Sequence, residues 1–394
     1  MTHTPSKFVG LHAHSGFSTF DGLGYPDEHI DFAIENGMDA IALTDHGHMN
    51  GFAHGYLHVE KLNAKGANFK FIPGCEMYVI PDLELWAKDH EIQRSLKKSS
   101  EVEIQTLRQE RRDLVTPIIA LTDTGSEVGA QASADNVNDN QLTIENEEET
   151  KSSKFYDPVK RRHHLVVLPK TKVGIERIFH LVSQGYNDGF YRFPRVDYSR
   201  LKKAAEGDHL IVSTACIGGP IAYEVFRPLQ GVAFDDLVPS LMDDPETAEK
   251  IIKGVTAAHK QLAWAVGVEN VYLELQFNKL SAQHLVNRAI IEFAKNNGMT
   301  DQLIVTCDSH YSNPNHWKER ELYKKLGWMG NDPSPLPEFD ELKCELYPKN
   351  ASQMWDEYLI HRDKHEFYKG QDQLICDAIE RTHDIAWEMC EDTW

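Results

Sequence analysis

The sequence predicts an α/β protein in which a barrel of parallel strands carries a metal centre at the ends of its strands. Short apolar segments, expected to be strands, alternate with longer segments of helical periodicity. Imidazole, carboxylate and thiol groups, which bind divalent transition metals, repeatedly end or follow these apolar segments. Strand ends are where a parallel barrel places its catalytic groups. The nine candidate ligands are His12, His14, Asp21, His46, Glu76, His164, Cys216, Asp308 and His310.

The N-terminal part of the chain shows the alternation clearly. Residues 40–43 and 69–72 are largely apolar and predict buried strands. Residues 27–37 predict a helix, because Pro26 precedes the segment and Gly37 ends it.

The alternation stops after about residue 83. Residues 84–114 are rich in charged side chains and predict one or two surface helices. Residues 122–157 contain few large apolar side chains and include the acidic run 145–149. Such a composition cannot bury enough apolar surface to offset the entropy lost on ordering. We therefore expect this segment to be mostly disordered and to loop out of the folded domain.

The alternation then resumes and continues to about residue 310. The expected strands are residues 164–168, 210–212, 271–275 and 303–305, and the expected helices are residues 173–185, 245–266 and 281–297. Prolines and aspartates in residues 331–341 predict a linker. Residues 342–394 have apolar side chains at helical spacing and predict a helical extension.

Composition excludes several classes of protein. At 41% hydrophobic residues, the chain of 394 residues can bury a sizeable core. It has no run of 18 apolar residues and no N-terminal apolar stretch, so we expect no membrane association and a cytoplasmic location. The six cysteines form no CxxC pair and are expected to be thiols. A formal net charge of −20 argues against tight, nonspecific binding of duplex DNA, but not against a nucleic-acid substrate.

Taken one at a time, the candidate ligands differ in how strongly they indicate a metal site. The pair His12 and His14 lies on one side of an extended segment, because side chains alternate along a strand. Alone, such a pair is more often coincidence than a metal site. His46 and Glu76 follow apolar runs in the same way, and Asp308 follows the last expected strand. Chance would have to explain every one of these positions separately, so the set as a whole favours a metalloenzyme.

The motifs resemble those of the polymerase-and-histidinol-phosphatase (PHP) domain, in particular the N-terminal domain of the bacterial DNA polymerase III alpha subunit. The resemblance covers roughly residues 7–330 apart from the insertion and, more weakly, the tail to about residue 390. The matching stretches are residues 11–22, 42–47, 72–78, 164–168, 189–191, 194–197, 213–216 and 307–311.

The resemblance implies an irregular (β/α)7 barrel of the PHP type with a helical C-terminal extension. It also implies two to three divalent ions, zinc and/or manganese. One ion would be held by His12, His14, Glu76 and Asp308, a second by Glu76, His164 and Cys216, and a third by Asp21, His46 and His310.

A metal-dependent 3′–5′ exonuclease that proofreads during DNA replication is the activity that the resemblance implies. The substrate would be DNA, preferably a single-stranded 3′ end, and the nucleophile a metal-bound water. Closely spaced divalent ions suit phosphoester cleavage, because they supply hydroxide near neutral pH and stabilise the leaving oxygen. Arg192 and Arg195, interleaved with Tyr191 and Phe193, could contact phosphates and stack on bases. A purely structural loop with surface arginines is an equal alternative.

Two other function classes stay open: a phosphatase for a small phosphorylated metabolite, and a noncatalytic scaffold that docks a polymerase body. Nine intact ligand positions count against the scaffold. The expected organisation is residues 1–82 and 159–330 as the PHP domain, residues 83–158 as an insertion, residues 331–341 as a linker and residues 342–394 as the extension.

The paired aspartates of a polymerase body are not found, so we do not expect this chain to polymerise DNA by itself. We expect an exposed apolar face on the extension, where a second chain carrying the polymerase active site would dock.

Overall fold

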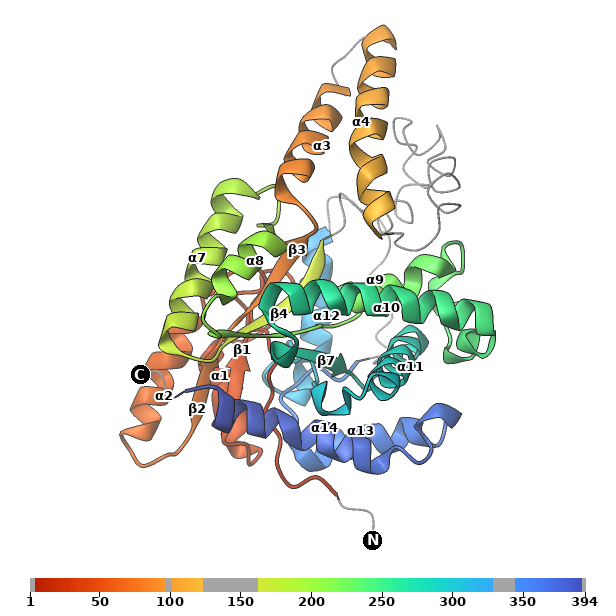
Figure 1. Ribbon diagram of the computed structural model, residues 1–394. Helices are drawn as coiled ribbons and strands as arrows, with labels where there is room; N and C mark the ends of the chain where they lie inside the picture. Colours follow the sequence, from red (N-terminus) through yellow and green to blue (C-terminus); the bar gives the residue numbers. More distant parts are fainter. Residues whose placement is uncertain (1–3, 97–100, 123–161, 329–343, 392–394) are drawn as a thin grey trace.

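The computed structural model describes residues 4–96, 101–122, 162–328 and 344–391, and it shows a mixed α/β protein (Figure 1). The expected fold class is thus confirmed. The strands are β1 Ala40–Leu43, β2 Lys70–Pro73, β3 Cys75–Ile80, β4 His163–Pro169, β5 Val196–Asp197, β6 Leu210–Ser213, β7 Val271–Leu275 and β8 Leu303–Val305.

Helices flank these strands along the whole described chain. They are α1 Pro26–Glu35, α2 Phe52–Asn63, α3 Leu83–Leu96, α4 Glu101–Thr122, α7 Lys172–Asp188, α8 Tyr198–Ala205, α9 Pro220–Phe226, α10 Pro245–Val266, α11 Ser281–Asn296, α12 Trp317–Trp328, α13 Ala351–Arg362 and α14 Asp372–Asp384. Several begin at side-chain caps, which satisfy backbone N–H groups of the first turn. The Thr171 side chain caps α7, and the Asp244 side chain caps α10.

The paired segments form a circuit that returns to its start. One sheet has the strand order β5-β3-β4-β6-β7-β8, and β1 pairs with β2. Only Gly74 separates β2 from β3. The N-terminal segment closes the circuit, because Gly10 bridges to Ile41 and Ala13 bridges to Ser309, just beyond β8. The circuit has seven members, which fits an irregular seven-stranded barrel. They are the N-terminal segment, β1, the nearly continuous pair of β2 and β3 counted as one member, β4, β6, β7 and β8.

The strands are not all parallel, which corrects one expectation. β4 runs antiparallel to both of its neighbours, β3 and β6. The first residues of β4 therefore lie at the same edge as the last residues of the parallel strands. This explains why His164 comes before its apolar run, whereas the other candidate ligands mostly end or follow theirs.

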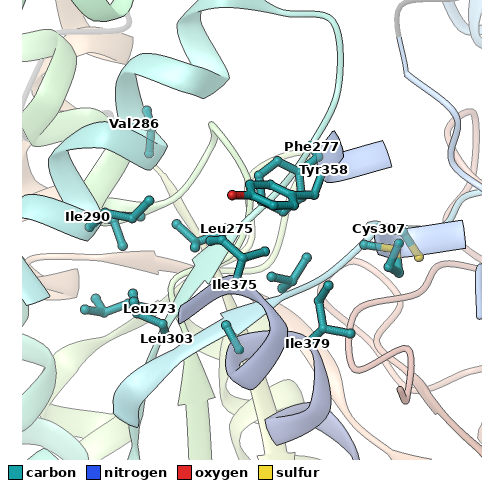
Figure 2. Close-up of a cluster of buried hydrophobic side chains, with 14 of the residues drawn as sticks. Leu273, Leu275, Phe277, Val286, Ile290, Leu303, Cys307, Tyr358, Ile375 and Ile379 are labelled. Atoms are coloured by element: carbon teal, nitrogen blue, oxygen red, sulfur yellow. The ribbon is translucent and has the colours of Figure 1, made fainter. Parts of the chain in front are cut away.

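The C-terminal extension packs against the barrel, so the expected exposed apolar face is wrong. Figure 2 shows Tyr358, Ile375 and Ile379 in one buried cluster with Leu275 of β7 and Leu303 of β8. The tail residues expected to form that face are nearly all buried: Met354, Tyr358, Ile375, Ile379, Ile385 and Ala386, with Leu359 partly buried. The helical spacing was identified correctly, but its partner is this chain's own barrel.

Helices α3 and α4 pack against each other and project away from the strands (Figure 1). The guanidinium of Arg111 donates to Asp89 at 2.6 Å, and both side chains are buried between the two helices. The surface helices expected at residues 84–114 are thus confirmed. The expectations for residues 123–157 and for the linker at 331–341 concern residues outside the described ranges. In the described part of the chain, no helix has both the length and the apolar character needed to cross a bilayer.

Candidate metal centre

Glu76 lies at the centre of the candidate site. It is the second residue of β3, and 1% of its surface is exposed. Its carboxylate oxygens lie 3.2 Å from His14 Nε2, 2.6 Å from His46 Nδ1 and 3.0 Å from His164 Nδ1. His12 Nε2 is 3.6 Å away. One carboxylate therefore contacts four imidazoles that come from three separate segments of the barrel.

His12, His14 and Asp308 form the deepest group. The extended segment places both imidazoles on one side, as the sequence predicts, with their Nε2 atoms 3.1 Å apart. Asp308 Oδ1 lies 3.1 Å from His12 Nε2 and 3.4 Å from His14 Nε2. All three side chains are buried. Their ligand atoms converge within 4.8 Å of one another, which is the arrangement a single ion requires.

A second group lies nearer to solvent. Asp21 Oδ2 is 3.1 Å from His46 Nε2 and 3.4 Å from His310 Nε2. The other carboxylate oxygen of Asp21 accepts from the guanidinium of Arg320, which also donates to the Asp21 backbone carbonyl at 2.7 Å. Arg320 therefore holds Asp21 in place and partly neutralises its charge.

His164 and Cys216 complete the set. His164 Nδ1 lies 3.0 Å from Glu76 and 4.0 Å from the Cys216 sulfur. The neighbouring His163 packs edge-on against Tyr223 instead, on the other face of β4. The structure therefore brings together all nine expected side chains. It does not separate them into three isolated groups, since His14 also lies close to His46 and His310.

Three buried atoms in the site lack hydrogen bonds, which supports metal binding. They are Glu76 Oε2, Asp308 Oδ1 and His46 Nδ1, and all three are shielded from solvent. A buried polar atom without a hydrogen bond carries a desolvation penalty. Bound divalent cations would offset that penalty. Imidazole, carboxylate and thiol donors at such spacing fit zinc, and the oxygen donors also suit manganese.

Residues at or next to several candidate ligands have positive φ angles. Asp308 and Ala215 adopt positive φ angles of 49° and 56°, a conformation that costs energy for residues other than glycine. Ala215 directly precedes Cys216, so one strained residue is a candidate ligand and the other lies next to one. Gly47, which follows His46, has φ 68°, and a Cβ there would lie 2.7 Å from Pro194. Only glycine fits this turn.

Glu274 is a residue of the site that the sequence prediction missed. It lies in β7, is 1% exposed, and accepts from His12 Nδ1 at 2.8 Å and from Gln276 at 2.9 Å. Ser213 and Thr306 also donate to it, each at 2.5 Å. When His12 is neutral, as metal binding requires, this contact keeps its proton on Nδ1 and leaves the Nε2 lone pair facing Glu76 and Asp308. An acidic residue inside an otherwise apolar strand was the available signal.

Replacing Glu274 with Gln should weaken metal binding without unfolding the protein. Gln has nearly the same shape, but its amide cannot accept all four hydrogen bonds, so the His12 ring loses its fixed orientation. Loss of such a partner typically lowers metal affinity by about 10–100-fold. Competition with a chromogenic chelator would measure the affinity. An unchanged affinity in the folded variant would show that Glu274 does not orient His12.

The charges of the site shift the pKa values of its histidines. Burial lowers the pKa of His46, but Glu76 and Asp21 outweigh it and raise that pKa to about 10. For His12, burial is likewise outweighed by Asp308, Glu274 and Glu76, and its pKa is raised well above the usual value. Burial and the charge of Arg320 lower the pKa of His310 to about 4.

Metal loading should therefore release protons. Metals bind neutral imidazole, so His46 and His12, protonated at pH 7.5 in the metal-free protein, must each lose a proton. Apparent metal affinity should rise with pH between about 6.5 and 10. In the metal-free protein, the raised His46 pKa stabilises the fold below pH 6.5, and that contribution is lost as pH approaches 10. Calorimetric titration in buffers of different ionisation enthalpy would count the protons, and a count near zero would contradict these pKa directions.

The two arginines expected to bind substrate have different environments. Arg192 is exposed, and its guanidinium lies 5.8 Å from the ring centre of Tyr191. Arg195 is 4% exposed, and its guanidinium donates to the backbone carbonyls of Tyr191 and Phe193 at 2.9 and 2.8 Å. This geometry does not fit a phosphate contact, so the expectation for Arg195 is corrected to a structural role in the loop.

Arg162 lies beside the site, although the sequence prediction passed over it. Its guanidinium lies 4.1 Å from the ring centre of Phe193 and 5.4 Å from that of Tyr78. The Tyr78 ring in turn lies 5.2 Å from the His164 ring and 5.8 Å from the His46 ring. A cation and two aromatic rings therefore border the candidate metal centre. No sequence pattern singles out Arg162, because its partners come from β3 and the loop before β5.

A mixed α/β fold with clustered imidazoles and carboxylates at one edge of its strands is typical of metal-dependent hydrolases. The family model described as the PHP domain matches residues 10–278. The chain therefore belongs to the PHP domain family, as the sequence motifs indicated.

Curated relatives named DNA polymerase III subunit alpha match most of this chain. The protein from Aquifex aeolicus is 28% identical over 78% of this chain and 18% of its own length. The Treponema pallidum protein is 27% identical over 88% and 21%, and the Borreliella burgdorferi protein is 24% identical over 98% and 24%. This chain thus spans about a fifth of the length of these relatives.

Proposed function

We propose that this protein is a metal-dependent phosphodiesterase that removes nucleotides from the 3′ end of single-stranded DNA. The observation that carries the proposal is the convergence of four imidazoles on Glu76, whose Oε2 atom has no hydrogen bond in the buried site. The family supports metal-dependent hydrolysis, and the relatives' name supports a role in DNA replication. A cytoplasmic location stays a prediction.

The nine side chains would hold two or three divalent ions, zinc or manganese. Glu76 would bridge the His12, His14 and Asp308 group to the His164 and Cys216 group. Asp21, His46 and His310 would hold the ion nearest to solvent. When bound, the ions supply an activated water and neutralise the charge that develops on the phosphate.

The protein's own residues would position the substrate. Arg162 supplies positive charge beside the site, and Arg192 is exposed next to Tyr191; a guanidinium can contact two phosphate oxygens at once. Tyr191 and Phe193 are partly exposed and offer faces on which unpaired bases can stack. Buried Glu274 would keep His12 oriented, and Arg320 would keep Asp21 in place. These features favour a polynucleotide over a small phosphorylated metabolite.

The test offers the metal-loaded protein a single-stranded oligonucleotide labelled at its 5′ end and, separately, p-nitrophenyl phosphate. A ladder of products shortened from the 3′ end is expected. Arg162→Ala should lower kcat/KM on the oligonucleotide by about tenfold, because one stacked and charge-assisted contact contributes about 1–3 kcal/mol. Arg177→Ala, on the outer surface of α7, is the matched control. Cleavage of the monoester with no cleavage of DNA would favour the phosphatase alternative.

A further inference from the structure

Three histidines outside the candidate centre gather at the junction between the barrel and the C-terminal extension. His284 lies on α11, His361 is in the last turn of α13, and His365 follows shortly after that helix. One ring nitrogen of each lies within 4.8 Å of one ring nitrogen of the other two. The His284 ring centre is 4.3 Å from that of His361 and 4.5 Å from that of His365.

We propose that His284, His361 and His365 form a second metal site, which binds a zinc ion or another imidazole-preferring transition ion and fastens the C-terminal extension to the barrel. Three imidazoles plus one water complete the tetrahedral coordination that zinc favours.

The local backbone presents His361 and His365 on the same side. The His365 backbone N–H donates to the His361 carbonyl at 3.2 Å, so one further turn follows α13 and brings the two residues together, although His365 itself is extended. Their ring centres lie 6.3 Å apart. His284 faces them from α11, and the third ligand is thus supplied by a segment distant in sequence.

Hydrogen bonding prepares His284 for metal binding. Its Nε2 is 2.7 Å from the carbonyl oxygen of Asn278, which can only accept, so Nε2 carries the proton. A ligand histidine commonly donates its other N–H to a backbone carbonyl in this way. The lone pair is therefore on Nδ1, where the Tyr368 hydroxyl donates at 2.9 Å. A bound metal would replace this one hydrogen bond, and Tyr368 would keep its bond from Asn287.

Packing alone does not account for the other two rings. His361 is only 4% exposed, yet in the part of the chain that the structure describes no hydrogen bond reaches its ring nitrogens or those of His365. The ring nitrogens of His361 and His365 are not fully buried, so they keep some contact with solvent. A shared metal would give one nitrogen of each ring a partner.

Nearby charges limit which metals would bind. Burial, followed by the charges of Lys364, His365 and Lys279, lowers the pKa of His361 to about 4. Burial and the two neighbouring histidines lower the pKa of His284 to about 3. The rings are therefore neutral near pH 7 and do not need to lose a proton. Positive neighbours weaken cation binding, so ions with high imidazole affinity should bind, whereas Mn²⁺ and Mg²⁺ should not.

The experiment measures the metal content of the full chain. Metal-free protein is loaded with Zn²⁺ or Mn²⁺, desalted and analysed by mass spectrometry for metal per chain. With Zn²⁺, the unmodified protein should bind one more equivalent than His365→Gln. With Mn²⁺, the two proteins should bind the same amount. His365 is half-buried at the end of a helix, so this variant should fold, and circular dichroism would verify it.

Two further variants separate this site from the candidate centre. His180→Gln, which changes an exposed histidine on α7, should keep the full zinc content. In a Glu76→Ala background, one zinc equivalent should remain and should disappear when His361→Gln is added. Equal zinc content in the unmodified protein and in folded His365→Gln would overturn the proposal.

Discussion

Replacing Glu76 with Ala should remove most of the bound metal and nearly all phosphodiesterase activity. Glu76 contacts His14, His46 and His164 within 3.2 Å, so its loss removes the shared carboxylate from several ligand groups at once. Two cations would then face each other without the negative charge between them. A loss of about 4 kcal/mol in transition-state stabilisation corresponds to roughly a thousandfold drop in kcat.

Two further variants make this result interpretable. Glu76→Gln keeps the side-chain volume and tests the charge alone, and we expect it to lose metal as well. Glu60→Ala removes an exposed glutamate from α2 and should change neither metal content nor activity. Metal analysis and the oligonucleotide assay measure both quantities. Full metal content and full activity in Glu76→Ala would rule out Glu76 as the bridging ligand.

The candidate ligands could be predicted from the sequence because their positions follow a local rule. Strand ends at one edge of a barrel converge, so a metal-binding residue after each apolar run indicates a shared site. His46 and Asp308 follow that rule directly. His164 does not, because β4 runs antiparallel and presents its first residues at that edge. Only the resemblance to the family, in which the ligand directly precedes the apolar run, distinguished His164 from His163.

Residues that act through tertiary contacts could not be predicted in the same way. Glu274 is one polar residue in an apolar strand, and its role depends on His12 lying opposite, 262 positions away in the sequence. Arg162 is one of two adjacent arginines, and only the fold places it against Phe193 and Tyr78. The four-residue spacing of His361 and His365 was visible, but their proximity to His284 was not.

The extension shows a different limit of sequence analysis. Apolar residues at helical spacing identify a buried face, but they do not say what covers it. The sequence analysis assigned that face to a second polypeptide. In the structure, α14 lies against β8, and its buried residues join the core formed by β7, β8 and α11 (Figure 2). The extension therefore contributes to the stability of this chain itself.

The effect of Ile379→Ala on stability should be large for that reason. Ile379 is fully buried in the cluster, and truncating a buried isoleucine to alanine costs about 2–5 kcal/mol through lost transfer free energy and the cavity left behind. Ile360→Ala is the matched control, because Ile360 belongs to the same extension but is 56% exposed. A surface substitution of this kind should change stability by less than about 0.5 kcal/mol. Urea unfolding followed by circular dichroism, at equal metal content, would give both values. If the two variants were equally stable, the extension would not be part of the core, and a surface for a second chain would again be the better account of its apolar face.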